Sequence, residues 1–278
     1  MQNKLFVLFL VLFSVLLAAC SSGKEKNAVL SDDAPPRPVE ELYNEAADAL
    51  DAKEYVKATK LFEDVEREYP YSKWATKAQL MAAFSAYQAD QYDEAIFAVD
   101  RFTELHPGNE DIDYAYYLKA LAYYEQISDV SRDQAMTEEA LKAFDTLITR
   151  FPESQYARDA KLKRDLTLDH LAGKEMEIGR YYLVRNQVNA AINRFRTVVK
   201  DYQTTTHTPE ALHRLVEAYL TLGLRTEATH VAAVLGYNYP GSKWYERSYK
   251  ILDDKSRQEI LEDRSFVDKT VDSLFKPE

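Results

Sequence analysis

The chain has 278 residues with a formal net charge of −11, and 46% of its residues are apolar. It holds only 7 Gly and 9 Pro, and its abundant Ala, Leu, Glu, Lys and Arg favour helices over strands. The negative charge argues against nucleic-acid binding, because contacts to phosphates need clustered Lys and Arg. It argues equally against adhesion to an anionic lipid surface through basic residues.

Residues 1–19 have the pattern of a lipoprotein signal peptide. Lys4 precedes an apolar core of 13 residues, Leu5 to Leu17, which is short for a membrane span. The core ends in Ala18-Ala19-Cys20, which resembles the bacterial lipobox, where the cysteine is lipidated and becomes the mature N-terminus. Because Cys20 is the only cysteine, intramolecular disulfides are excluded, and acylation explains this residue better than a chance buried thiol. We expect a covalent diacylglycerol and N-acyl lipid on Cys20 and no other cofactor.

Residues 20–38 are predicted to form a lipidated, flexible tether. The segment combines Ser21-Ser22-Gly23, mixed charges and Pro35-Pro36, and it has little apolar area to bury. Ser21 in place of Asp after the cysteine resembles the pattern of outer-membrane retention. We therefore expect a globular part that stands away from the periplasmic face of the cell outer membrane.

A punctuating motif recurs along the rest of the chain. Aromatic-Pro-X-Ser occurs at 69–72, 151–154 and 239–242, and a weaker copy begins at His106-Pro107. Proline cannot continue a helix, and a serine two residues later suits the cap of the next one. The motif therefore predicts helical repeats.

With the motif's proline at position 32, a 34-residue tetratricopeptide (TPR) frame fits the chain. Close helix crossings need small residues, with large ones filling the space beside them. The predicted fold is an all-α solenoid of about five TPR helix-turn-helix repeats with a C-terminal capping helix. The expected repeats are 39–72, 73–110, 111–153, 172–205 and 208–241, and the small crossing residues of their second helices are Ala58, Ala95, Ala140, Ala191 and Ala228.

Three segments depart from the regular frame. The third repeat carries a polar insertion at 125–137 between its expected helices at 113–124 and 138–150. An extra helix at 154–171 precedes the fourth repeat and is expected to continue into its first helix, since Gly173 is the only break. After the capping helix at 242–252, residues 253–278 form an acidic amphipathic tail that either covers the last repeat or docks on a partner.

The sequence contains no pattern typical of catalysis or metal binding. We expect no metal-like i, i+4 pair between any of the five His and an acidic residue, and neither a nucleophile elbow nor a Gly-rich phosphate loop is present. We therefore expect no catalytic residues and no metal site, and predict a scaffold that is not an enzyme.

Four runs carry a resemblance to a known family: Arg67-Glu68-Tyr69-Pro70, Val99-Asp100-Arg101-Phe102, Asp111-Ile112-Asp113-Tyr114 and Ala191-Ile192-Asn193-Arg194-Phe195. From about Cys20 to Tyr239 the chain resembles the BamD family of outer-membrane lipoproteins, which belong to the β-barrel assembly machinery. The resemblance implies a scaffold needed for insertion of β-barrel proteins into the outer membrane. Its implied partners are the POTRA domains of BamA, other Bam lipoproteins such as BamE, and unfolded β-barrel substrates.

The resemblance also implies site residues. Arg194, with Asn193 beside it, occupies the position that binds an acidic POTRA residue in the family, and the alternative is a solvated surface arginine. Ala190, Ala191 and Phe195 are committed to packing, so both polar side chains are expected to face outward. First-helix positions and their neighbours in the first two repeats are expected to line a substrate groove, or else to belong to the core between repeats: Tyr43, Leu50, Tyr69, Leu80, Phe84, Tyr87 and Arg101.

Rival functions use the same lipobox and repeats. A TPR lipoprotein could serve as a scaffold for peptidoglycan or cell-division partners, or act in a secretion system. These proteins would lack the Tyr-Pro and Asn-Arg runs quoted above, so barrel assembly is the main prediction.

Overall fold

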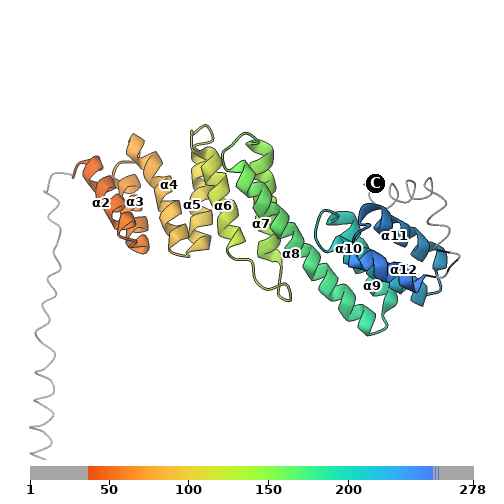
Figure 1. Cartoon of the computed structure of the whole chain (residues 1–278). Coiled ribbons are helices and arrows are strands. Elements are labelled where there is room, and N and C mark those ends of the chain that lie inside the picture. Colours follow the sequence, from red (N-terminus) through yellow and green to blue (C-terminus); the bar gives the residue numbers. More distant parts are fainter. Residues whose placement is uncertain (1–36, 253, 255, 257–278) are drawn as a thin grey trace, which may run out of the picture. The chain divides into compact units, whose positions relative to one another are not determined.

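A computed structural model describes residues 37–252, 254 and 256, and these form helices and no strand (Figure 1). The compact unit that contains the helices begins at Val39. The helices are α2 (Val39–Asp51), α3 (Tyr55–Glu68), α4 (Lys73–Gln88), α5 (Tyr92–Leu105), α6 (Ile112–Tyr124), α7 (Ala135–Arg150), α8 (Ala157–Val184), α9 (Val188–Asp201), α10 (Thr208–Thr221), α11 (Arg225–Asn238) and α12 (Lys243–Ile251).

Successive helices pack in pairs, as in TPR proteins. The pairs are α2 with α3, α4 with α5, α6 with α7, α8 with α9, and α10 with α11, and α12 packs on the last pair. First helices of neighbouring pairs also touch, since α2 contacts α4 and α4 contacts α6. The predicted all-α repeat architecture is confirmed.

The small crossing residues lie where the frame predicts them. Ala58, Ala95, Ala140, Ala191 and Ala228 are all fully buried. Large side chains fill the space beside the crossings, among them Phe62, Phe144 and Phe195, each with no exposed area. Helix pairs can approach this closely because alanine adds only a methyl group at the contact.

In four of the helix pairs, the turn between the two helices contains one residue with a positive φ, a geometry that the residue types do not reveal. Lys53, Asp90, Asn186 and Gly223 have φ between 58° and 75°. In the first pair, the N–H of Glu54 donates to the carbonyl of Ala49, as in a Schellman motif, and equivalent bonds follow the other three residues. Only one of the four is glycine, so residue type alone does not reveal the left-handed position.

The third and fourth pairs are joined through one long helix. α8 spans 28 residues and passes Gly173 without a break, so its first half packs on α7 and its second half pairs with α9. The insertion before α7 ends earlier than expected, because α7 begins at Ala135 rather than at Glu138. The insertion is tied to α8 by Lys174, whose Nζ donates to the carbonyl of Ser131 at 2.9 Å.

Two of the three predicted serine caps are confirmed. Ser72 Oγ accepts from the N–H of Ala75 at 3.0 Å, and Ser242 Oγ accepts from Trp244 at 3.1 Å. The prediction for Ser154 is wrong, since α8 begins only at Ala157. Ser154 Oγ accepts from the N–H of Tyr156 at 3.1 Å, ahead of the helix, and its hydroxyl donates to Asp113 Oδ2 at 2.6 Å, which ties this segment to α6.

Several predictions lie outside the described residues. These are the signal peptide at 1–19, the lipidated Cys20, most of the tether and nearly all of the tail after Leu252. Within the described part of the chain, no helix combines the length and apolar character needed to span a membrane.

Candidate interaction site

Two of the predicted groove residues are core residues. Tyr43 is 8% exposed and packs on Phe62 and Trp74, with ring centroids 5.3 and 4.7 Å apart, while Leu80 is 7% exposed. Both belong to the apolar clusters between neighbouring helices. For Tyr43 and Leu80 the structure favours the alternative, that they belong to the core between repeats, because neighbouring helices pack directly on these side chains.

The other apolar positions are half-buried. Leu50 and Tyr69 pack against the first cluster, and Phe84 and Tyr87 pack against the second. Burial raises the pKa of Tyr87, with the carboxylate of Glu125 contributing in the same direction. These four side chains still present part of their surface to solvent.

Arg101 lies with the second helices rather than with the first. It belongs to α5, and its Nη2 donates to Glu66 Oε2 on α3 at 2.5 Å. Glu66 also accepts from Gln79 Nε2 on α4 at 2.6 Å. Glu66 therefore ties α3, α4 and α5 together, and the role of Arg101 in a substrate groove stays a prediction.

Arg194 is not the free, outward-facing arginine that its helical position suggested. Its Nη1 lies 3.2 Å from both carboxylate oxygens of Glu175 on α8. The Glu175 side chain is 17% exposed and that of Arg194 is 42% exposed. Glu175 thus fixes the guanidinium. Within residues 37–252, Nε and Nη2 of Arg194 have no acceptor, so they can donate to a further carboxylate.

Asn193 precedes Arg194 on α9 and is exposed. Its side-chain amide makes no hydrogen bond to the described residues, and its backbone carbonyl accepts from Thr197 Oγ1 at 3.2 Å. The structure therefore places an unengaged amide next to the fixed guanidinium.

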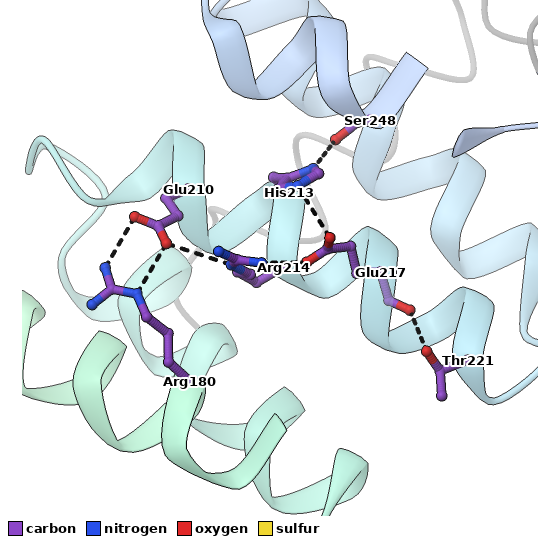
Figure 2. Close-up of polar contacts among 7 residues, drawn as sticks. All are labelled: Arg180, Glu210, His213, Arg214, Glu217, Thr221 and Ser248. Atoms are coloured by element: carbon purple, nitrogen blue, oxygen red, sulfur yellow. Dashed lines mark hydrogen bonds and ion pairs between the residues drawn. The ribbon is translucent and has the colours of Figure 1, made fainter. Parts of the chain in front are cut away.

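A second polar network joins α8, α10 and α12, and sequence reasoning missed it (Figure 2). Arg180 Nε and Nη2 each lie 2.9 Å from one oxygen of Glu210. Arg214 reaches both Glu210, at 3.4 Å, and Glu217, at 2.8 Å. Burial opposes ionisation of Glu210, but Arg180 and Arg214 outweigh it and lower the pKa of its carboxyl.

His213 connects this network to α12. The ring is 3% exposed, its Nδ1 lies 2.8 Å from Ser248 Oγ, and its Nε2 lies 3.4 Å from Glu217 Oε1. The hydrogen bond from His213 and then that from Arg214 lower the pKa of Glu217 to about 2, against the effect of burial. His213 and Glu217 lie four residues apart on α10, so the expectation that no histidine has an acidic partner at that spacing is wrong.

Cationic side chains gather around Trp244 at the same end of the chain. Arg247 and Lys243 lie 4.9 and 5.0 Å from its ring, and Arg214 lies 5.6 Å away. Arg247 and Lys243 are exposed. These exposed cations beside an aromatic ring suit an acidic group of a partner.

The described residues contain no group of three or more His, Cys, Asp or Glu side chains that could hold a metal ion.

Comparison with known proteins shows to which family the chain belongs. The YfiO family, described as an outer membrane lipoprotein, matches residues 35–235. The chain is 49% identical over 252 residues to the outer membrane protein assembly factor BamD of Caulobacter vibrioides, which covers 91% of this chain and 82% of that protein. The chain belongs to the BamD family. The corresponding BamD of Rickettsia prowazekii is 47% identical, covering 87% of this chain and 94% of that protein.

BamD-family membership confirms the resemblance seen in the sequence and the prediction of an outer-membrane assembly factor. Among solved structures, a TPR protein of Thermus thermophilus is similar at 18% identity and a TM-score of 0.36, covering 76% of this chain and 97% of that chain. The BamD relatives are similar over nearly their whole lengths, so the assignment applies to the full repeat array rather than to one repeat.

Proposed function

We propose that this chain is a non-catalytic, lipid-anchored scaffold of the β-barrel assembly machinery. The support is its membership of a family of outer-membrane assembly factors, together with an array of packed helix pairs that presents charged and aromatic side chains. Stacked repeats suit a scaffold because they offer long surfaces on which several partners can bind side by side.

The proposed contact with BamA uses the C-terminal repeats. The observation that carries it is Arg194, whose guanidinium is held by Glu175 yet keeps two donors for a carboxylate of a POTRA domain. Asn193 adds an exposed amide at the same edge. Because Glu175 already orients the guanidinium, less side-chain freedom is lost on binding.

The proposed contact with unfolded barrel proteins uses the N-terminal repeats. Leu50, Tyr69, Phe84 and Tyr87 keep part of their surface exposed next to well-packed clusters. Half-buried aromatic and aliphatic side chains on a rigid support suit an extended peptide with an aromatic end. Further Bam lipoproteins such as BamE are proposed as additional partners.

The proposed anchor is the lipid on Cys20, which would hold the chain at the periplasmic face of the outer membrane. Several acyl chains bind a bilayer durably, where a single chain binds only marginally. Mass spectrometry of the mature protein should find a chain that starts at Cys20 and carries diacylglycerol and N-acyl groups. An unmodified N-terminus would refute the anchor.

Arg194→Gln tests the BamA contact without unfolding the chain. Arg194→Glu is less suitable, because it would place a second carboxylate beside Glu175. Binding of the purified POTRA domains should weaken by ~2–5 kcal/mol if the pair is buried at the interface. Isothermal titration calorimetry measures this change, and the melting temperature should stay nearly constant.

The matched control is Arg196→Gln, which removes the same charge from an exposed position two residues along α9. It should leave the affinity for the POTRA domains nearly unchanged. Equal affinities of the Arg194→Gln and parent proteins would show that Arg194 is an ordinary surface arginine.

A further inference from the structure

The second helices of the first two repeats enclose a groove that the proposed function leaves unused. It lies between α3 and α5 and has a volume of about 760 Å³. We infer that this groove binds a partner segment that presents a lysine or arginine next to an apolar side chain. This groove does not include Arg194 or any residue of the proposed POTRA contact.

The walls of the groove are joined by a hydrogen-bonded network. Glu66 on α3 accepts from Arg101 on α5 at 2.5 Å and from Gln79 on α4 at 2.6 Å. Gln79 is 7% exposed, and its Oε1 lies 2.9 Å from Nε2 of His106 at the end of α5. The groove is thus formed before any ligand arrives, and a partner need not order it on binding.

The charges at the groove favour a cation. Both guanidiniums in its lining are already engaged, since Arg101 pairs with Glu66, and Arg67 pairs with Asp64 at 2.5 Å. The exposed carboxylates of Glu63, Asp93 and Glu94 also line the groove and have no ion pair among the described residues. A positively charged side chain would find unneutralised carboxylates on both walls.

Phe97 supplies the apolar part of the recognition. It lines the groove with 73% of its area exposed, although every other phenylalanine of the repeat pairs is more buried. An aromatic face beside carboxylates suits the aliphatic stem and charged head of lysine or arginine, through cation–π attraction and burial of apolar area.

A fluorescein-labelled peptide of ten alternating lysine and leucine residues is the probe. Fluorescence anisotropy at fixed salt measures its affinity for the mature protein, and a peptide with glutamate in place of lysine is the control ligand. We expect the lysine peptide to bind and the glutamate peptide not to bind. Phe97→Ala should weaken binding about five- to tenfold, the size expected for loss of one aromatic contact.

Matched variants separate the groove from general attraction to an acidic chain. Asp93→Asn combined with Glu94→Gln should weaken binding about threefold or more. Glu177→Gln combined with Glu227→Gln removes the same charge from exposed positions on α8 and α11, and Tyr237→Ala removes an aromatic ring that is 56% exposed. These control variants should bind the lysine peptide like the parent.

Three results would overturn the inference. They are the absence of binding of the lysine peptide to the parent, an unchanged affinity of the Phe97→Ala variant, and equal losses in the groove and control charge variants. Because Phe97, Asp93 and Glu94 are exposed, circular dichroism should show the same helix content and melting in all variants. If Phe97→Ala nevertheless misfolds, the paired charge variants decide alone.

Discussion

At the scale of single residues, Gly179 sets the distance between α8 and α9. A Cβ atom built at this position would lie 2.4 Å from Cε1 of Phe195, which is fully buried. No real Cβ contact is that short, so the ring can occupy its site only because residue 179 has no side chain. Even the methyl group of alanine would be too large at this position.

Gly179→Ala should therefore destabilise the fold, although alanine favours helices over glycine by roughly 1 kcal/mol. Overpacking a core costs about 1–3 kcal/mol, and a clash with a fully buried ring belongs at the upper end. We expect the melting temperature to fall by about 2–8 °C. Gly108→Ala is the control, since its Cβ would meet no atom within 4 Å. Equal melting of the two variants would mean that α9 can shift away from α8 at little cost.

Glu217 links stability to pH. Its folded-state pKa of about 2 lies below the ordinary value of 4.5, so its contribution to stability is fully present above pH 4.5 and is lost as the pH falls toward 2. The melting temperature of Glu217→Gln should thus lie below that of the parent at pH 6, and the difference should shrink as the pH falls. Glu246→Gln, an exposed carboxylate on α12, is the control. A difference that stays constant from pH 6 to pH 2.5 would contradict the role of this carboxylate.

At the scale of secondary structure, the position of α12 depends on a contact between two residues that are 35 positions apart in the sequence. Ser248 on α12 is fully buried and bonds to Nδ1 of His213 on α10 at 2.8 Å. Gly236 lies beside the same helix, because a Cβ there would be 2.6 Å from the Tyr245 ring. Close packing and one buried hydrogen bond therefore hold α12 on the last pair.

Ser248→Ala should loosen α12 more than any other helix. The substitution leaves Nδ1 of a buried histidine without a partner, which costs about 1–3 kcal/mol. Hydrogen exchange followed by mass spectrometry should show faster exchange across Lys243–Ile251 and unchanged exchange in α2. Glu246→Ala on the exposed side of α12 should exchange like the parent. Similar protection of α12 in both variants would show that apolar packing alone holds the helix.

Much of the helix arrangement could be predicted from sequence, for a steric reason. A close helix crossing tolerates only a small residue, so alanines at a regular spacing, such as Ala58, Ala95 and Ala228, identify the second helix of each repeat. The contacts of the polar residues could not be predicted, because they depend on which helices become neighbours. Arg101 meets Glu66 at a separation of 35 positions, and Arg194 meets Glu175 at 19. The exposed fraction of each side chain in the first helices could not be predicted either. Tyr43 and Phe84 are both aromatic, and only their packing in the folded chain distinguishes them.

At the scale of the whole molecule, the repeats carry different chemistry along the chain. The second helices of the first two repeats present carboxylates and Phe97, whereas the C-terminal repeats present Arg194, Arg247 and Lys243. A chain with a net charge of −11 thus still presents cationic side chains in its C-terminal part. This division would let a scaffold hold more than one partner at a time.

Affinity purification from a mild detergent extract of the source bacterium, with quantitative mass spectrometry, tests the proposed scaffold most directly. Tagged parent and Arg196→Gln proteins should recover BamA, together with other Bam lipoproteins such as BamE. Arg194→Gln should recover much less BamA at the same level of tagged protein. Recovery of peptidoglycan-binding, cell-division or secretion proteins without BamA would contradict the account.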